Sequence, residues 1–126
     1  MRIFKAKSFA RWAEKESVSD RTLTAAVAEI ERGLIDAELG GGVVKKRIAR
    51  EGGGKSGGYR TIIAWRSGSR AFFLYGFPKN ARENVGAAEL KALKALAREL
   101  LSYTKDQLRQ AVGKGALMEV KADEEE

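Results

Sequence analysis

The sequence predicts an α+β fold in which N-terminal and C-terminal helices pack on a small antiparallel β-sheet. Apolar residues recur at helical spacing in the first third of the chain and again after Pro78. Between these regions, segments rich in β-branched and aromatic residues alternate with glycine-rich turns, which is typical of an antiparallel meander. A chain of 126 residues can bury one sizeable core. We therefore expect a single domain over residues 1–122, followed by an acidic tail at 123–126.

The N-terminal third is expected to form a short strand and two helices. Residues 3–7 alternate weakly, as a strand does, and Ser8 is expected to cap the helix that follows. Ser17 and Asp20 resemble a capping box for a second helix, which should end before Gly40. The apolar stripe of this second helix consists of Leu23, Val27, Ile30 and Leu34.

Three extended segments follow and form the predicted meander. They are Val43–Ala49, Tyr59–Arg66 and Ala71–Phe77. The short turn at 67–69 predicts a hairpin. The glycine-rich residues 52–58 predict a longer loop, which we expect to be mobile until a ligand orders it.

The C-terminal part is expected to return to helix. Its leucines predict a helix of about four turns; they are Leu90, Leu93, Leu96, Leu100 and Leu101. Thr104 and Gln107 form a second capping box, for a short helix that Gly113 can close. Residues 117–121 are expected to form an edge strand.

The composition excludes most familiar active sites. The chain has no cysteine and no histidine, which removes disulfides, thiolate nucleophiles, sulfur-ligated zinc and the usual general base. We therefore expect no cofactor and no metal. No apolar run approaches the ~20 residues of a membrane helix, and residues 1–5 do not resemble a signal peptide. A cytoplasmic protein that does not bind membranes is expected.

The positive charge is concentrated in the middle of the chain. The whole chain has a net charge of +7, whereas residues 45–82 alone have +9. The cations of this segment are Lys45, Lys46, Arg47, Arg50, Lys55, Arg60, Arg66, Arg70, Lys79 and Arg82. Such a segment is typical of a polyanion-binding face, and the alternative is a solvated basic surface.

Residues 49–56 resemble a phosphate-binding P-loop in which alanine replaces the first glycine. A P-loop needs a helix directly after its Lys-Ser pair, so that backbone amides point at the phosphates. Here residues 57–63 predict a strand, so we reject a nucleotide hydrolase. The loop can still bring Lys55 to a phosphate.

Several cations are expected to meet at one end of the sheet. Lys45 and Arg47 are two residues apart on a strand and leave the same face, with Lys46 on the opposite face. Arg60 begins the next strand and Lys79 follows the third, so both can join the pair. The alternative interpretation is that these cations only discourage edge pairing.

Aromatic side chains are candidates either for the core or for stacking on nucleic-acid bases. Alternate positions of a helix-covered strand are normally core. We therefore assign to the core Trp12, Phe72, Phe73, Tyr75 and Phe77. Tyr59 adjoins Arg60 and the glycine-rich loop, so it stays a candidate for stacking.

Three segments carry a resemblance to a known family: residues 40–47 (GGGVVKKR), 54–60 (GKSGGYR) and 70–80 (RAFFLYGFPKN). In these, and over nearly its whole length, the chain resembles the RelE/HigB toxins of type II toxin–antitoxin systems. The resemblance implies a RelE/ParE-like fold and a basic site that cleaves ribosome-bound mRNA without a metal, which inhibits translation. It also implies an antitoxin partner, such as a helix-turn-helix DNA binder.

The resemblance also implies a set of site residues. The expected catalytic residues are Arg60, Lys45, Arg47 and Lys79. The expected RNA-binding residues are Lys55, Tyr59, Lys46, Asn80 and Arg82. The chain departs from the RelE pattern at residues 85–87, where Val-Gly-Ala stands in place of a segment with a tyrosine, and it lacks the histidines of some HigB toxins.

RNA cleavage is feasible with these residues because RNA carries its own nucleophile. If the 2′-hydroxyl attacks the adjacent phosphate, the protein must align the two groups, neutralise the phosphorane and help the leaving oxygen take a proton. Arg60 is then the expected charge clamp, while Lys45 and Arg47 hold neighbouring phosphates. The alternative function is that of a non-catalytic ParE-like toxin that inhibits DNA gyrase.

Overall fold

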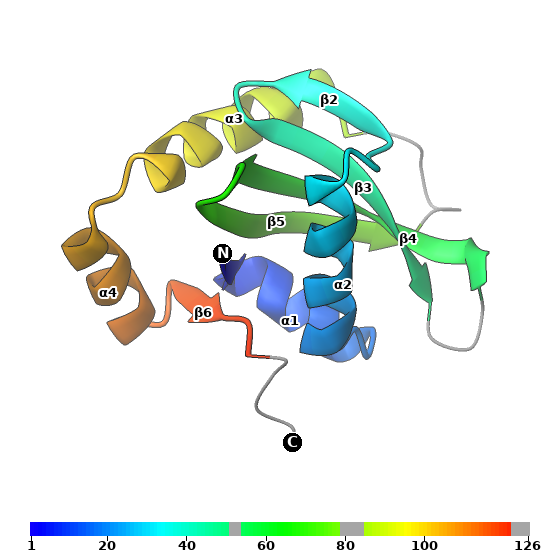
Figure 1. Cartoon of the computed structure of the whole chain (residues 1–126), viewed down its shortest axis with the longest axis horizontal. Coiled ribbons are helices and arrows are strands. Elements are labelled where there is room, and N and C mark those ends of the chain that lie inside the picture. The colour runs from blue at the N-terminus through cyan, green and yellow to red at the C-terminus, as the bar shows by residue number, and fades with distance from the viewer. Residues whose placement is uncertain (51–53, 79–84, 122–126) are drawn as a thin grey trace.

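The computed structural model describes residues 1–50, 54–78 and 85–121. The α+β class predicted from the sequence is confirmed. In chain order, two helices precede the central strands and two follow them (Figure 1). The elements in chain order are β1 (Arg2–Ala6), α1 (Lys7–Lys15), α2 (Asp20–Glu31), β2 (Ala37–Gly40), β3 (Val43–Arg50), β4 (Gly54–Arg66), β5 (Arg70–Pro78), α3 (Ala87–Leu101), α4 (Lys105–Gly113) and β6 (Leu117–Glu119). No helix in this part of the chain has the length and apolar content that crossing a membrane requires.

In the part of the chain that the structure describes, six strands form one sheet, in the order β2-β3-β4-β5-β1-β6. β3, β4 and β5 make the predicted antiparallel meander, and Gly68, with a φ of 72°, lies in the predicted hairpin turn. The other described strand pairs are antiparallel as predicted, and β1, which runs parallel to β5, is the exception among the described strands. A parallel pair needs a long crossover, which the helices and strands between β1 and β5 supply.

Helices cover both faces of the sheet and bury two apolar clusters. α1 and α2 lie across one face (Figure 1). The side chains buried there include Phe9, Leu23, Ile30, Val44, Ile63 and Phe73. The other face packs against α3 and α4, and its buried side chains include Phe4, Val43, Ile62, Phe72, Leu100 and Leu108. All five aromatic residues assigned to the core pack against one cluster or the other, as predicted.

The first helix begins earlier than predicted. α1 starts directly after β1, with Ala6 at the N-cap position and no side-chain cap bond. Ser8 therefore lies inside the first turn, and its predicted role as the cap is wrong.

The second helix is capped by a different serine. α2 begins at Asp20, and the hydroxyl of Ser19 accepts a hydrogen bond from the Thr22 N–H at 3.2 Å. The predicted cap, Ser17, has a φ of 61°, whereas an N-cap residue needs an extended backbone. Ser17 instead turns the chain between α1 and α2.

α2 is shorter than predicted, and an unpredicted strand follows it. The helix ends at Glu31, and Gly33, with a φ of 87°, adopts the left-handed conformation beyond it. β2 then pairs antiparallel with β3, so glycines 40–42 form the turn between these strands and do not end a helix. Leu34 is consequently 50% exposed and does not extend the apolar stripe.

Most of the predicted glycine-rich loop belongs to β4. This strand begins at Gly54, which is paired with Arg50 of β3 after a register shift. A Cβ atom at Gly58 would lie 2.1 Å from the carbonyl oxygen of Ile48, so the close approach of the two strands requires glycine. The predicted loop is therefore wrong for residues 54–58, and residues 52–53 lie outside the described residues. The continuous strand after residues 55–56 supports the rejection of a P-loop.

The C-terminal elements largely follow the prediction. α3 is the leucine-rich helix, and the capping box of α4 forms as expected: the Thr104 hydroxyl accepts from the Gln107 N–H at 3.1 Å, and Gln107 Oε1 accepts from the Thr104 N–H at 2.8 Å. The left-handed glycine after α4 is Gly115 and not Gly113. β6 is the predicted edge strand, and it pairs with β1.

The packing of α1 on the sheet depends on a glycine of β5. A Cβ atom at Gly76 would lie 2.4 Å from Trp12 Cζ3, because the indole ring rests directly on this position. The same ring meets the ring of Tyr59 edge-on, with centroids 5.1 Å apart. The glycine therefore provides the space in which Trp12 packs between α1 and the sheet.

We expect Gly76→Ala to lower the free energy of unfolding by about 1–3 kcal/mol, because the added methyl group must displace the indole. Urea denaturation measures this change. The control is Gly113→Ala in α4, where an added Cβ meets nothing within 4 Å, and its stability should stay unchanged or rise by up to about 1 kcal/mol. A Gly76→Ala protein as stable as the parent would contradict this account of the contact.

Candidate nucleic-acid interface

Arg47 and Arg60 face each other across β3 and β4. They are directly paired in the antiparallel register, so both side chains leave the same face of the sheet. Lys45, which is paired with Ile62, is the next residue of β3 on that face. The structure thus brings three of the four expected catalytic residues to one face.

An acidic side chain lies beside the two arginines. Asp36 Oδ2 is 3.8 Å from Arg60 Nη1 and 3.9 Å from Arg47 Nε. These separations are ion-pair contacts and are too long for hydrogen bonds. The side chains of Arg60, Asp36 and Arg47 are 10%, 24% and 36% exposed. We call Asp36, Arg47 and Arg60, together with Lys45, the arginine site.

The arginine site has hydrogen-bonding capacity that the described protein does not use. The Nε atoms of Arg47 and Arg60 are both buried and have no hydrogen-bond partner among the described residues. A buried donor on a charged group is costly to leave unpaired. Guanidinium groups bind phosphate and carboxylate oxygens through such donors. The geometry therefore suits an oxyanion that contacts both arginines.

Lys46 leaves the opposite face, as predicted, but it is only 5% exposed. Its Nζ atom lies 2.6 Å from Glu29 Oε1 and donates to the carbonyl oxygen of Leu34 at 2.8 Å. These contacts tie the end of α2 and the segment after it to β3. Lys46 is thus placed to hold the fold, and we leave it out of the proposed RNA contacts.

Tyr59 lies on the same face as Lys46 and is 3% exposed. Its hydroxyl is 3.1 Å from Glu16 Oε1, to which it donates a hydrogen bond, and its ring packs against Trp12. The ring has no face open to a base, so the expectation that Tyr59 stacks on RNA is not supported.

The remaining expected residues are not placed by the structure. Lys79, Asn80 and Arg82 lie outside the described residues. Lys55 belongs to β4, but its side chain is also outside what the structure describes.

Asp36 is the site residue that sequence reasoning missed. The second helix was expected to extend through this segment, which hid its proximity to β3. Residues 35–39 alternate between apolar and acidic or small residues, and this pattern is also that of an edge strand. Ending the helix at Gly33 would have revealed the strand beside β3, but strict alternation from Ala37, which is paired with Lys45, would place Asp36 on the opposite face. Asp36 lies in the bend before β2, and this bend brings its side chain to the two arginines.

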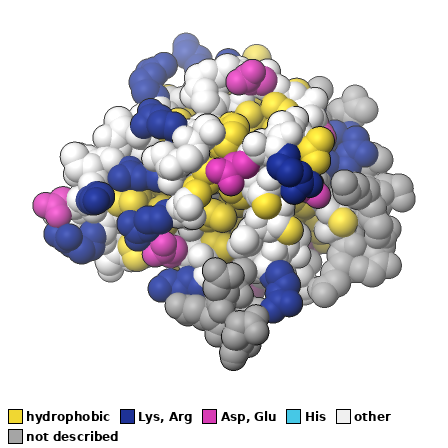
Figure 2. All heavy atoms as spheres, viewed as in Figure 1, with side chains coloured by type: hydrophobic (Ala, Val, Ile, Leu, Met, Phe, Trp, Pro, Cys, Tyr) yellow, Lys and Arg dark blue, Asp and Glu magenta, His cyan; other side chains and the backbone are white. Residues whose placement is uncertain are grey.

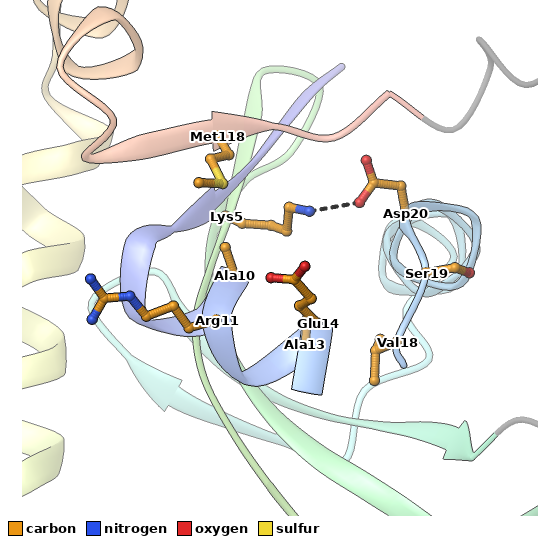
Figure 3. A pocket seen from close by; sticks show the side chains of 9 residues that line it. All are labelled: Lys5, Ala10, Arg11, Ala13, Glu14, Val18, Ser19, Asp20 and Met118. Carbon is orange, nitrogen blue, oxygen red and sulfur yellow. Dashed lines mark hydrogen bonds and ion pairs between the residues drawn. The ribbon is translucent and has the colours of Figure 1, made fainter. Parts of the chain in front are cut away.

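Hollows elsewhere on the described surface are separate from the arginine site. One of about 350 Å³ is lined by residues of α1, α2 and β6, and in Figure 3 Lys5 and Asp20 point toward each other across it, with Nζ and Oδ1 2.8 Å apart. Another of about 420 Å³ is lined in part by Arg11, Leu96 and Tyr103. On the face that carries α1 and α2, basic and acidic side chains are interspersed (Figure 2). Among the described residues, no group of three or more His, Cys, Asp or Glu side chains could hold a metal ion.

Comparison with known proteins identifies a family. Residues 1–120 match the family model of the RelE toxin of the RelE/RelB toxin–antitoxin system. The match spans every element from β1 to β6. No curated protein matches the chain. The RelE part of the resemblance is thereby confirmed, whereas the match does not distinguish the HigB branch.

We expect Lys46→Met to lower the free energy of unfolding by about 1–3 kcal/mol, because Glu29 and the Leu34 carbonyl both lose their buried partner. Chemical denaturation measures the loss. Lys91→Met, the same change at an exposed position of α3, should stay within about 0.5 kcal/mol of the parent. Equal losses in the two variants would show that the contacts of Lys46 are dispensable to the fold.

Proposed function

The chain belongs to the RelE toxin family, and from this premise we propose that it is a ribosome-dependent endoribonuclease that cleaves messenger RNA and thereby inhibits translation. As the toxin of a toxin–antitoxin system, it has an antitoxin as its partner. The observation that supports catalysis most directly is the pair of opposed arginines with buried, unpartnered Nε–H donors among the described residues.

The proposed reaction uses the 2′-hydroxyl of the RNA as the nucleophile. The 2′-hydroxyl loses its proton as its oxygen bonds to the adjacent phosphorus, and the bond from phosphorus to the 5′-oxygen breaks as that oxygen takes up a proton, which yields a 2′,3′-cyclic phosphate and a 5′-hydroxyl. Negative charge accumulates on the non-bridging oxygens in the transition state. Donors that already point at those oxygens stabilise the charge without reorganising. The chemistry therefore calls for fixed cations, which the arginine site supplies.

Arg60 is the proposed clamp on the scissile phosphate. It is the more buried of the two arginines, and its backbone lies within β4, between β3 and β5. A side chain held by a rigid sheet keeps its orientation better than one on a loop. We assign Arg47 and Lys45, which are less buried, to the scissile phosphate and its neighbours. Lys79 stays a proposed catalytic residue, and Lys55, Asn80 and Arg82 stay proposed RNA contacts, on the sequence alone.

The antitoxin is proposed to cover this basic region. Residues 45–82 have a net charge of +9, so an acidic segment of the partner would be complementary to them. A helix-turn-helix DNA binder is one such partner. Since ribosomes and mRNA are the proposed targets, we place the activity in the cytoplasm.

Added to a cell-free translation reaction, the purified protein is expected to stop synthesis and to leave mRNA cut within the translated region, as primer extension would show. Naked mRNA should stay intact, because the ribosome aligns the reacting groups. Intact mRNA together with loss of DNA supercoiling by gyrase would identify a ParE-like inhibitor and overturn the proposal.

Arg60→Ala should lower the cleavage rate at saturating ribosome by about 10²–10³-fold, as when one oxyanion donor is removed. Ribosome affinity should fall much less, since the interaction matters chiefly in the transition state. Arg98→Ala, at an exposed position of α3, should change neither quantity.

Because Arg60 is only 8% exposed, thermal unfolding is measured for each variant. Arg60→Lys keeps a cation at the site but loses the planar fork, so it should remain folded and still cleave slowly. Parent-like cleavage by folded Arg60→Ala would show that the clamp has been assigned to the wrong residue.

A further inference from the structure

The carboxylate of Asp36 contacts both arginines without using their Nε–H donors. Its Oδ2 atom lies 3.8 Å from Arg60 Nη1 and 3.9 Å from Arg47 Nε, and the two Nε atoms remain without a hydrogen-bond partner among the described residues. A carboxylate at this separation balances charge but does not occupy the donors. The site is thus neutralised in part, and the described residues leave its two Nε–H donors unused.

The position of Asp36 is fixed by its own backbone and by the segment before it. Its own N–H donates to the carbonyl oxygen of Lys45 at 2.9 Å, which begins the pairing of β2 with β3. Two residues earlier, the Leu34 carbonyl accepts the hydrogen bond of Lys46 Nζ at 2.8 Å from the opposite face. The segment between α2 and β2 is therefore held against β3, and the carboxylate is held with it.

The arginines need such a partner because of their register. Like charges directly opposite each other on neighbouring strands destabilise the pair. Arg60 has 10% of its side chain exposed, so water screens its charge poorly. Without a nearby anion the two guanidinium groups would move apart, and their donors would no longer converge on one oxyanion.

We propose that Asp36 is a positioning residue, which holds the guanidinium groups of Arg47 and Arg60 side by side as a phosphate-binding pair. The inference rests on the proposed function in one respect, namely that the phosphate belongs to RNA. Removing the carboxylate makes the site more positive, so a purely Coulombic account predicts tighter phosphate binding. A positioning role predicts the opposite result.

The test compares the parent with Asp36→Asn, Asp36→Glu and Glu38→Gln. Glu38→Gln is the matched control, since it removes the same charge from an exposed position of β2. The first readout does not depend on catalysis: NMR of the arginine Nε–Hε groups during titration with inorganic phosphate at constant ionic strength. The second is single-turnover cleavage of ribosome-bound mRNA.

In the parent and in Glu38→Gln, we expect protected Nε–Hε signals of Arg47 and Arg60 that shift with phosphate. In Asp36→Asn these signals should exchange faster with water and phosphate should bind severalfold more weakly, while the cleavage rate should fall by about 10–100-fold. Asp36→Glu keeps the charge but moves it by one methylene, so its phosphate affinity and its cleavage rate should lie between those of the parent and of Asp36→Asn. Tighter phosphate binding or parent-like cleavage by Asp36→Asn would overturn the proposal.

Thermal unfolding shows whether each variant is folded. If Asp36→Asn does not fold, Asp36→Glu decides, and parent-like phosphate binding and cleavage by that variant would overturn the inference. If the parent itself does not cleave mRNA but the Nε–Hε signals respond as expected, the proposed function fails and the role of Asp36 stands.

Discussion

The pairing of β3 with β4 is the constraint on which the rest of the site depends. Because this register sets Arg47 directly opposite Arg60, it decides that two cations share one face of the sheet. The same alternation sends Lys46 to the opposite face, beside the helices. Gly58 permits the close approach of the strands next to this point, since a side chain there would strike the Ile48 carbonyl. A slip of one residue would exchange the buried cation with the site cations.

Successive cations of β3 are neutralised in different ways. Lys46 is paired with Glu29 at 2.6 Å and with the Leu34 carbonyl, so its donors are engaged with the protein. Arg47 meets Asp36 only at 3.9 Å, and its Nε–H stays unpartnered within the described part of the chain. The short contacts of Lys46 hold the fold, whereas the longer contact of Arg47 with Asp36 leaves the Nε–H of Arg47 available to a ligand. The difference arises because the end of α2 and the segment after it supply both a carboxylate and a carbonyl oxygen to Lys46, whereas Asp36 is the acidic partner that the described residues supply to Arg47.

The strands and their faces could be predicted from the sequence, but the partners of the cations could not. Alternation alone placed Lys45 and Arg47 together and Lys46 opposite, because the two-residue period of a strand is strict. It could not show that Lys46 is buried, since this depends on where α2 ends. The position of Asp36 could not be predicted either, because this residue lies in a bend before β2, where the alternation of a strand does not apply. Tyr59 shows the limit of sequence adjacency: it follows Gly58 and precedes Arg60, yet its ring lies on the opposite face, under Trp12.

In the proposed reaction, the contribution of the two arginines comes from their position and charge and not from proton transfer. A guanidinium group stays charged at any physiological pH, so it cannot act as the general base, and what it offers is a fixed charge and fixed donors. Such donors accelerate a reaction only in proportion to how well they already match the transition state. The donors must therefore be held in place: the sheet register does so for the arginine backbones, and Asp36 is proposed to do so for the side chains. The bend that leads into β2, which sequence reasoning overlooked, thereby acquires a role in the proposed chemistry, because it brings the Asp36 carboxylate to the arginine pair.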